Sequence, residues 1–269
     1  MSGAGPLELA LYVSSAGEAS KAEAGHSRLY YGHEFCERLL PSRAEVRAVC
    51  AAASGRGITF VTPYVTERGL GRLRGLLEAL GEACPGAEVV FNDWGTLRLL
   101  ETGFSGLRPV LGRLLHKMKR GPRLAALADA FGDETAAYFR TCSLDVPLYQ
   151  RFLRSKGVER VELDNVLQGI ALDLGTSGLR ASLYTPYGYI ATTRLCLAAS
   201  CDQHGMEDEV GVFGCRKECR RFTFEIAQHG SPVKQYRKGN TVFFENARLP
   251  ANLAGSGIDR IVNEPRIPF

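Results

Sequence analysis

Residues 57–94, GITFVTPYVTERGLGRLRGLLEALGEACPGAEVVFNDW, decide the fold class of this chain. Two apolar segments rich in β-branched residues, 57–65 and 87–94, predict buried strands. Between them, residues 69–80 repeat leucine at a spacing of three or four positions, so a helix that covers a sheet is predicted over residues 68–83. Strand, helix and strand in this order predict a βαβ unit with parallel strands.

The same alternation continues in both directions along the chain. Eight predicted strands with intervening helices indicate an α/β fold, a TIM-like (β/α)8 barrel, and such a barrel of about 250 residues forms one domain. We therefore expect residues 1–269 to be a single barrel domain, with a doubly wound open sheet as the alternative. The chain stops directly after the eighth strand, so an incomplete barrel without its last helix is expected. The other strands are expected at about residues 7–13, 28–32, 107–111, 158–164, 181–193 and 258–263, and the other helices at 42–53, 125–139 and 147–155.

Residues 196–246 interrupt the alternation. They show no strand–helix rhythm, contain four cysteines and include the β-rich stretch KGNTVFFEN at residues 238–246. We expect a cysteine-rich insertion after the seventh strand, at the end of the barrel where loops build binding sites.

Five cysteines are candidate ligands of one metal centre: Cys196, Cys201, Cys215 and Cys219 lie within 24 positions, and Cys36 follows the second predicted strand. Thiolates gathered in irregular chain suit a soft metal. Zinc is one possibility, but paired Cys-x2-Cys knuckles are absent, and the Cys-x3-Cys spacing fits an iron–sulfur cluster better. Spacing alone leaves either Cys36 or Cys201 as a ligand beside the other three. The remaining cysteines have apolar neighbours and are expected to be buried structural thiols: Cys50, Cys84 and Cys142.

Several short motifs occur in a fixed order along the chain. They are YYGHEFC at 30–36, NDWG at 92–95, GRLL at 112–115, LDN at 163–165, RLC at 194–196 and Cys-x3-Cys at 215–219. This order resembles the peptidase U32 (collagenase-like) family, most closely its UbiV branch, whose proteins take part in oxygen-independent ubiquinone hydroxylation.

The resemblance implies a TIM-like barrel and a [4Fe-4S] cluster held by Cys36, Cys196, Cys215 and Cys219. It also implies a subunit of an oxygen-independent hydroxylase, or of a related system that modifies a small molecule or RNA, working with a second related barrel subunit. The chain departs from the pattern of that branch in the longer gap between Cys196 and Cys215 and in the extra thiol of Cys201 within that gap.

Six polar residues follow predicted barrel strands, where such barrels carry their substrate-binding residues. Structural alternatives exist, since Asp93 and Asp164 could cap helices and Glu34 could pair with Arg38. The arginine among the six begins a basic run that is expected to receive an anionic small molecule or RNA, with a solvated loop as the alternative. The six are His33, Glu34, Asn92, Asp93, Arg113 and Asp164, and the basic run comprises Arg113, His116, Lys117, Lys119, Arg120 and Arg123.

The composition excludes several classes of protein. With 45% apolar and 23% charged residues the chain is of ordinary globular type, and a net charge of +4 does not by itself indicate nucleic-acid binding. The first residues do not resemble a signal peptide, and no apolar stretch approaches the length of about 20 residues that spans a membrane. We therefore expect a cytoplasmic protein without membrane contact, whose cysteines serve metal or redox chemistry.

Peptidase activity is less expected than the hydroxylation role, because the motifs of serine and zinc peptidases are absent. Two alternatives remain open. One is a U32-type protease or peptide-binding module with a structural metal. The other is a non-catalytic electron-transfer or scaffold subunit.

Overall fold

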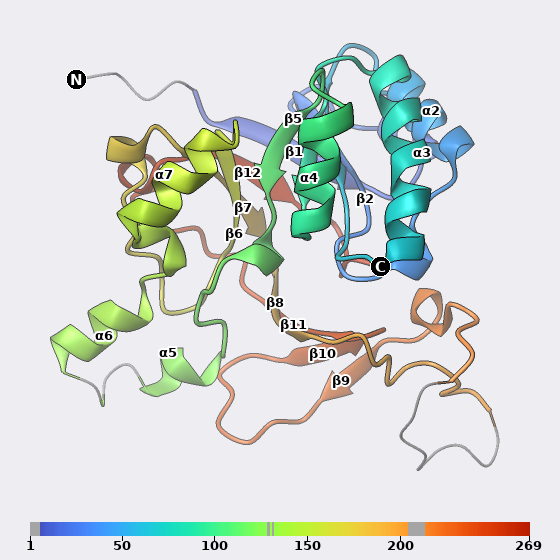
Figure 1. The fold of residues 1–269 in the computed structure, drawn as a ribbon. Helices are drawn as coiled ribbons and strands as arrows, with labels where there is room; N and C mark the ends of the chain where they lie inside the picture. Colours follow the sequence, from blue (N-terminus) through green and yellow to red (C-terminus); the bar gives the residue numbers. More distant parts are fainter. Residues whose placement is uncertain (1–5, 128–129, 131, 204–212) are drawn as a thin grey trace.

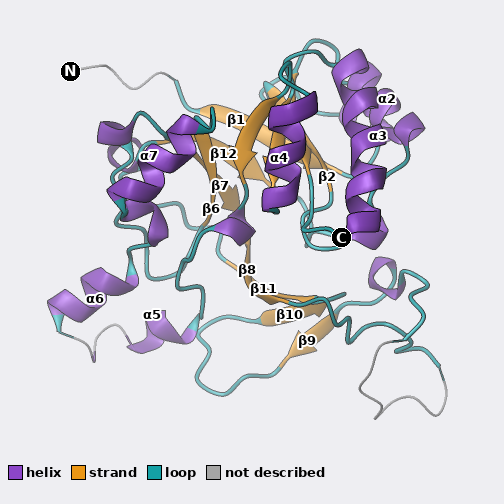
Figure 2. Cartoon of the chain, viewed as in Figure 1, coloured by secondary structure: helices purple, strands orange, loops and turns teal. Residues whose placement is uncertain are grey.

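The computed structural model describes residues 6–127, 130, 132–203 and 213–269 (Figures 1 and 2). Eight parallel strands form a closed barrel in the order β1-β12-β7-β6-β5-β4-β3-β2. The sheet closes because the first strand pairs with the last, with Glu8 opposite Arg260, which excludes the open sheet and confirms the predicted barrel. The barrel strands are β1 (Glu8–Val13), β2 (Arg28–Gly32), β3 (Gly57–Val61), β4 (Glu88–Phe91), β5 (Arg108–Leu111), β6 (Arg160–Asp164), β7 (Arg180–Thr185) and β12 (Ile258–Asn263).

Helices flank the outside of the barrel (Figure 2). The helix predicted over residues 68–83 is confirmed as α3, which buries leucines such as Leu73, Leu77 and Leu80 in the main apolar core. None of the helices described combines the length and apolar character that a membrane crossing requires. The helices are α1 (Ala16–Ser20), α2 (Arg43–Ala52), α3 (Glu67–Ala83), α4 (Trp94–Gly103), α5 (Arg123–Leu127), α6 (Asp133–Phe139) and α7 (Pro147–Ser155).

Two predicted elements have different bounds in the structure. The strand predicted over residues 87–94 ends at Phe91, because the Asp93 carboxylate accepts a hydrogen bond from the Gly95 amide at 2.7 Å and begins α4, a helix that was not predicted. The helix predicted over residues 125–139 forms the two short helices α5 and α6, and residues 128, 129 and 131 between them lie outside the described residues.

The chain leaves the barrel at Pro186 and enters a second, antiparallel sheet. The single strand predicted over residues 181–193 is therefore two strands, because proline lacks the amide hydrogen that a continuous ladder needs. This second sheet lies beyond the carboxyl ends of the barrel strands, below the barrel in Figure 1, and three of its strands fall within residues 196–246. Its strands, in spatial order, are β8 (Tyr187–Thr192), β11 (Thr241–Glu245), β10 (Gln235–Lys238) and β9 (Phe224–Ile226).

Aromatic packing fixes the second sheet over the barrel mouth. The rings of Phe35, after β2, and Phe243, in β11, meet edge to face at 5.3 Å. The Asn240 side-chain amide donates to the Phe35 carbonyl at 2.8 Å. No helix follows β12 among the described residues, and Phe269 stacks on Phe35 at a centroid distance of 6.1 Å.

Four charged side chains pair at the amino ends of the barrel strands, and we call this group the barrel floor. Arg260 contacts Glu88 Oε2 at 2.7 Å and Glu8 Oε2 at 2.6 Å, and Arg28 contacts Glu8 Oε1 at 2.8 Å. Burial acts to raise the pKa of Glu88, but the hydrogen bonds and charge of Arg260 outweigh burial and bring that pKa to about 2. Within these four side chains each charge has an opposite partner; Arg260 and Glu88 are buried, whereas the Glu8 side chain is 25% exposed.

Candidate functional site

Four of the five candidate cysteines line one pocket, which we call the thiol pocket. Cys36 comes from the loop after β2, Cys196 from the turn after β8, and Cys215 and Cys219 from the segment before β9. Cys201, the alternative ligand, is half-buried and does not line this pocket. Residues far apart in the sequence therefore meet here in the set that the resemblance implies.

One buried carboxylate joins the two cysteine-bearing segments of the second sheet. Glu218 is 1% exposed and accepts hydrogen bonds from the amides of Ser200 and Arg216, both at 3.0 Å. Gly239 allows the turn between β10 and β11 to lie close to Cys219. Its φ is +58°, and a Cβ there would lie 3.2 Å from Cys219 Cβ. The thiol pocket is thus shaped by backbone contacts that these residues specify.

Burial raises the pKa of the Cys36 and Cys196 thiols, and it raises the pKa of Cys219 to about 12. Part of this rise at Cys219 comes from the negative charges that Cys196, Cys36 and Cys215 would carry, so these thiols lie near Cys219. The thiolate is the form that binds metal. A metal that binds here therefore has to displace protons, and its uptake should strengthen as the pH rises.

The thiols do not converge on a single point. Within the described ranges, no three His, Cys, Asp or Glu side chains are placed to hold one metal ion. Four thiolates on one zinc ion lie about 2.3 Å from the metal and so within about 4 Å of one another. The same four cysteines line the thiol pocket.

The other three cysteines lie away from the thiol pocket. Cys142 is buried, with 7% of its surface exposed. Cys50, in α2, and Cys84, at the end of α3, are half-buried and pack against the main core. The Cys50 thiol donates a hydrogen bond to Cys84, which raises the pKa of Cys50 and lowers that of Cys84, so these two thiols contact each other.

Arg113, a predicted substrate-binding residue, lies inside the barrel with no exposed surface. Its guanidinium contacts Glu34 Oε2 at 2.6 Å, Asp164 Oδ1 at 3.0 Å and Glu264 Oε1 at 3.4 Å. Arg120 adds a contact with Asp164 Oδ2 at 2.6 Å. We call these five side chains the mouth cluster. Because protein carboxylates already oppose Arg113, an anionic ligand would have to displace one of them.

The remaining predicted substrate residues have different surroundings. Asn92 is buried and holds two strand ends together, donating to the Thr62 carbonyl at 2.8 Å and accepting from the Leu114 amide at 3.0 Å. Asp93 caps α4. His33 is half-buried, and burial, together with nearby basic side chains, lowers its pKa to about 4, so it is neutral at pH 7. Asn92 and Asp93 therefore have structural roles, whereas His33 faces a pocket described below.

The basic run does not form the open positive mouth that was expected. Three of its members are buried: Arg113 and Arg120 belong to the mouth cluster, and His116 contacts the Glu162 carbonyl at 2.7 Å. Burial lowers the pKa of His116 to about 4. The expectation was wrong because carboxylates at other strand ends draw the arginines inward, where they satisfy buried negative charge.

Exposed basic side chains gather at a different place, in a groove beside the thiol pocket. Arg38, Arg68, Arg72 and Lys217 line this groove together with Cys215. Their side chains come from the loop after β2, from α3 and from the turn before Cys219. The sequence did not reveal this grouping, because these residues come from three separate segments.

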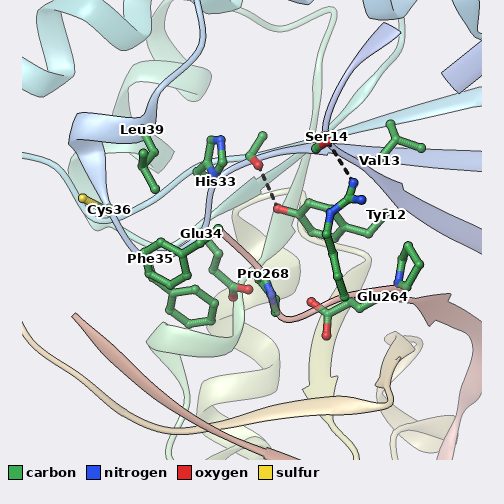
Figure 3. Close-up of a pocket in the computed structure, with 14 residues that line it drawn as sticks. Tyr12, Val13, Ser14, His33, Glu34, Phe35, Cys36, Leu39, Glu264 and Pro268 are labelled. Atoms are coloured by element: carbon green, nitrogen blue, oxygen red, sulfur yellow. Dashed lines mark hydrogen bonds between the residues drawn. The ribbon is translucent and has the colours of Figure 1, made fainter. Parts of the chain in front are cut away.

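A second pocket, the barrel pocket, opens at the carboxyl ends of β1, β2 and β12 (Figure 3). Its polar side chains are Tyr12, Ser14, His33, Glu34, Glu264 and Arg266, and Cys36 lines both this pocket and the thiol pocket. Glu264 was not among the predicted site residues, although it follows the strand predicted over residues 258–263 as directly as the six candidates follow theirs. The same rule would have found it.

Comparisons with known proteins assign no activity to this chain. No family model matches the chain, and no curated protein matches it by sequence. Among solved structures, the chain is similar to a U32 peptidase at 12% identity and a TM-score of 0.47, over 100% of this chain and 96% of that one. It is also similar to dihydropteroate synthase from Thermus thermophilus (15% identity, TM-score 0.40, 96% and 88% covered). A GH18 chitinase from Cycas revoluta shows 11% identity, a TM-score of 0.38 and coverage of 96% and 94%. At these identities, activity has to be argued from the residues of this chain.

Proposed function

We propose that this protein is a U32-type protein that binds a [4Fe-4S] cluster through Cys36, Cys196, Cys215 and Cys219. The observation that carries the proposal is the thiol pocket, which groups these four side chains and leaves Cys201 outside. Four cysteine thiolates are the usual ligands of such a cluster. Three of the four come from the segment between β7 and β12, and the fourth comes from the opposite end of the chain.

The spacing of the cysteines favours a cluster over a single zinc ion. Paired Cys-x2-Cys knuckles are absent, and Cys215 and Cys219 have the Cys-x3-Cys spacing. Each thiolate of a [4Fe-4S] cluster binds a different iron atom. Zinc remains the alternative that the experiment below distinguishes.

The proposed role is oxygen-independent hydroxylation, or a related modification, of a small molecule or RNA. When bound, the cluster would supply electron transfer. The protein residues would bind and orient the substrate in the barrel pocket, whose wall is shared with the thiol pocket through Cys36 and Phe269. The basic groove at Cys215 offers exposed positive charge to an anionic substrate such as RNA.

Anaerobic purification of the whole chain tests the proposal. Iron and acid-labile sulfide should each be about four per chain, with the absorption and EPR spectra of an iron–sulfur protein. Alanine substitution of each ligand in turn (Cys36→Ala, Cys196→Ala, Cys215→Ala, Cys219→Ala) should lower iron retention. Cys201→Ala is the matched control and should retain the cluster. Stoichiometric zinc without iron would refute the proposal, and iron loss in Cys201→Ala with retention in Cys36→Ala would refute the ligand assignment.

A second related barrel subunit is proposed as the partner. Exposed apolar side chains on α4 and α7 support this: Trp94 is 44% exposed, Leu148 69% and Phe152 41%, and the rings of Trp94 and Phe152 meet at 5.8 Å. Such apolar surface commonly marks an interaction site. Native mass spectrometry of protein purified from its own host should show a second chain, and Leu148→Asp should remove it. A fully active monomer would contradict the proposal.

A further inference from the structure

The barrel pocket carries two buried carboxyl oxygens without a hydrogen-bond partner. They are Glu34 Oε1 and Glu264 Oε2, and among the described residues neither finds a donor. Glu34 is 2% exposed and Glu264 is 1% exposed. Both residues line the barrel pocket (Figure 3). A buried acceptor without a donor is costly, so these oxygens are suited to hydrogen-bond donors on a ligand.

The charges of the mouth cluster do not balance when all its carboxyls are ionised. Glu34, Asp164 and Glu264 would supply three negative charges, against two positive charges from Arg113 and Arg120. Burial, together with the negative charges of Glu34 and Asp164, raises the pKa of Glu264 well above its usual range. The raised pKa favours the neutral form of Glu264 while the pocket is empty, so two carboxylates then face two arginines. A cation bound beside Glu264 would be opposed by ionisation of this third carboxyl, with release of its proton.

The basic side chains at the barrel pocket already have hydrogen-bond or ion-pair partners within the protein. Arg266 donates to Ser14 Oγ at 2.8 Å and pairs with Glu18, and Arg113 is surrounded by carboxylates. The pocket also contains the aromatic rings of Tyr12, Phe35 and Phe269, and aromatic rings attract cations. An anion would thus meet carboxyl oxygens and rings, whereas a cation would meet complementary groups.

We propose that the barrel pocket binds a positively charged nitrogen group, an ammonium or guanidinium carried on an apolar body, with Glu34 and Glu264 as its acceptors. The apolar walls contributed by Val13, Leu39 and Pro268 accommodate the body of the ligand. This preference differs from the anionic ligand expected at the basic run. It goes beyond the proposed function and holds whether or not the thiols carry a cluster.

Three probes of nearly the same shape and different charge test this inference on the whole chain as purified. Benzylamine is a cation at pH 7, benzyl alcohol is neutral and benzoate is an anion. Titration followed by calorimetry or ligand-observed NMR should give an affinity for benzylamine about tenfold or more above that for benzyl alcohol, with no binding of benzoate. Equal affinity for benzylamine and benzyl alcohol, or tighter binding of benzoate, would overturn the proposal.

Substitution of Glu264 tests whether benzylamine binds in the barrel pocket. Glu264→Gln keeps the shape and removes the ability to ionise, so it should weaken benzylamine binding about tenfold and leave benzyl alcohol within about twofold. Glu23→Gln, at an exposed position, is the charge-matched control and should bind as the unsubstituted protein does. Unchanged benzylamine binding in Glu264→Gln would overturn the assignment. If that variant does not fold, the three-probe series on the unsubstituted protein decides alone.

A divalent cation is a different class of ligand for two carboxyls. Magnesium or calcium at the same concentration as benzylamine should not displace it, because the described residues contain no metal-binding group of three ligand side chains. Full displacement of benzylamine by either metal, with tighter binding of the metal, would count against a nitrogen cation as the preferred ligand.

Discussion

The two ends of the barrel both bury ion pairs, but they differ in how completely the charges are matched. At the barrel floor, two arginines oppose two glutamates, and the pKa of Glu88 falls to about 2. At the mouth cluster, two arginines oppose three carboxyls, and burial raises the pKa of Glu264. Both ends leave carboxyl oxygens without a donor among the described residues, Glu162 Oε2 near the floor and Glu34 Oε1 and Glu264 Oε2 at the mouth cluster. Of these, Glu34 and Glu264 line the barrel pocket, whereas Glu162 does not. In barrels of this type the carboxyl end carries the site.

The largest expected effect tests the floor. Arg260 is 2% exposed and contacts both glutamates, so Arg260→Ala leaves these two carboxylates with Arg28 as their one cation of the floor. We expect the free energy of unfolding to fall by about 3–5 kcal/mol, measured by urea denaturation at pH 7. Arg98→Ala, on the exposed side of α4, should change it by less than about 0.5 kcal/mol. A loss of similar size in both variants would remove the basis for calling the floor structural.

The pH dependence of stability should have opposite signs at the two ends. The pKa of Glu88 is lowered on folding from 4.5 to about 2, so its contribution is full above pH 4.5 and is lost as the pH falls toward 2. That loss is about 3 kcal/mol. The pKa of Glu264 is raised from 4.5, so its contribution is full below pH 4.5 and is lost as the pH rises.

Urea denaturation from pH 3 to pH 9 measures both slopes. Glu88→Gln should flatten the acid side of the stability profile, and Glu264→Gln should flatten the alkaline side. If both variants flatten the same side, the two ends do not differ in the way described.

A pair of substitutions within the mouth cluster compares its members directly. Glu34 receives two hydrogen bonds from Arg113, at 3.0 and 2.6 Å, so Glu34→Gln should cost about 2–3 kcal/mol of stability. Glu264→Gln should cost less than about 1 kcal/mol at pH 7, because the raised pKa favours the neutral form of this carboxyl. Equal losses in the two variants would show that Glu264 is as firmly paired as Glu34.

The smallest effect concerns the packing of the second sheet over the mouth. Gly239 has a φ of +58°, and a Cβ there would lie 2.7 Å from the Phe269 ring. Gly239→Ala should lower the free energy of unfolding by about 1–2 kcal/mol. Gly81→Ala is a matched control in α3, where nothing lies within 4 Å of the added Cβ; it should stabilise the protein slightly. A neutral Gly239→Ala would indicate that the turn adapts without cost.

The sequence predicted the barrel elements well where local signals mark both ends. The predicted segments 28–32, 147–155 and 258–263 match β2, α7 and β12. Proline begins α7 and a glycine with positive φ ends β2. The prediction failed at Pro186, where one apolar stretch serves two sheets, and at α4, whose capping Asp93 was interpreted as the end of a strand.

Long-range pairing limited what the sequence could predict about the site. The ion-pair partners of Arg113 are 79, 51 and 151 positions away, so its burial is invisible to any local pattern. The meeting of Cys36 with the later cysteines in one pocket is equally non-local, and only the resemblance selected Cys36. The cluster and its chemistry stay predictions until iron is measured.

The stem of the second sheet has a consequence for modularity. Tyr187 and Glu245 are paired neighbours in β8 and β11, and the Asn246 amide returns to the Pro186 carbonyl at 2.7 Å. Residues 187–245 therefore leave the barrel and return to it at the same place, as the two strands of a hairpin do. A two-residue turn can close such an antiparallel pair, so a shortened gene that joins Gly188 to Phe244 through Asn-Gly would omit all four clustered cysteines, leave Cys36 and retain every barrel strand. The cysteine-bearing segment could thus be inserted or deleted as one unit, in evolution or by protein engineering.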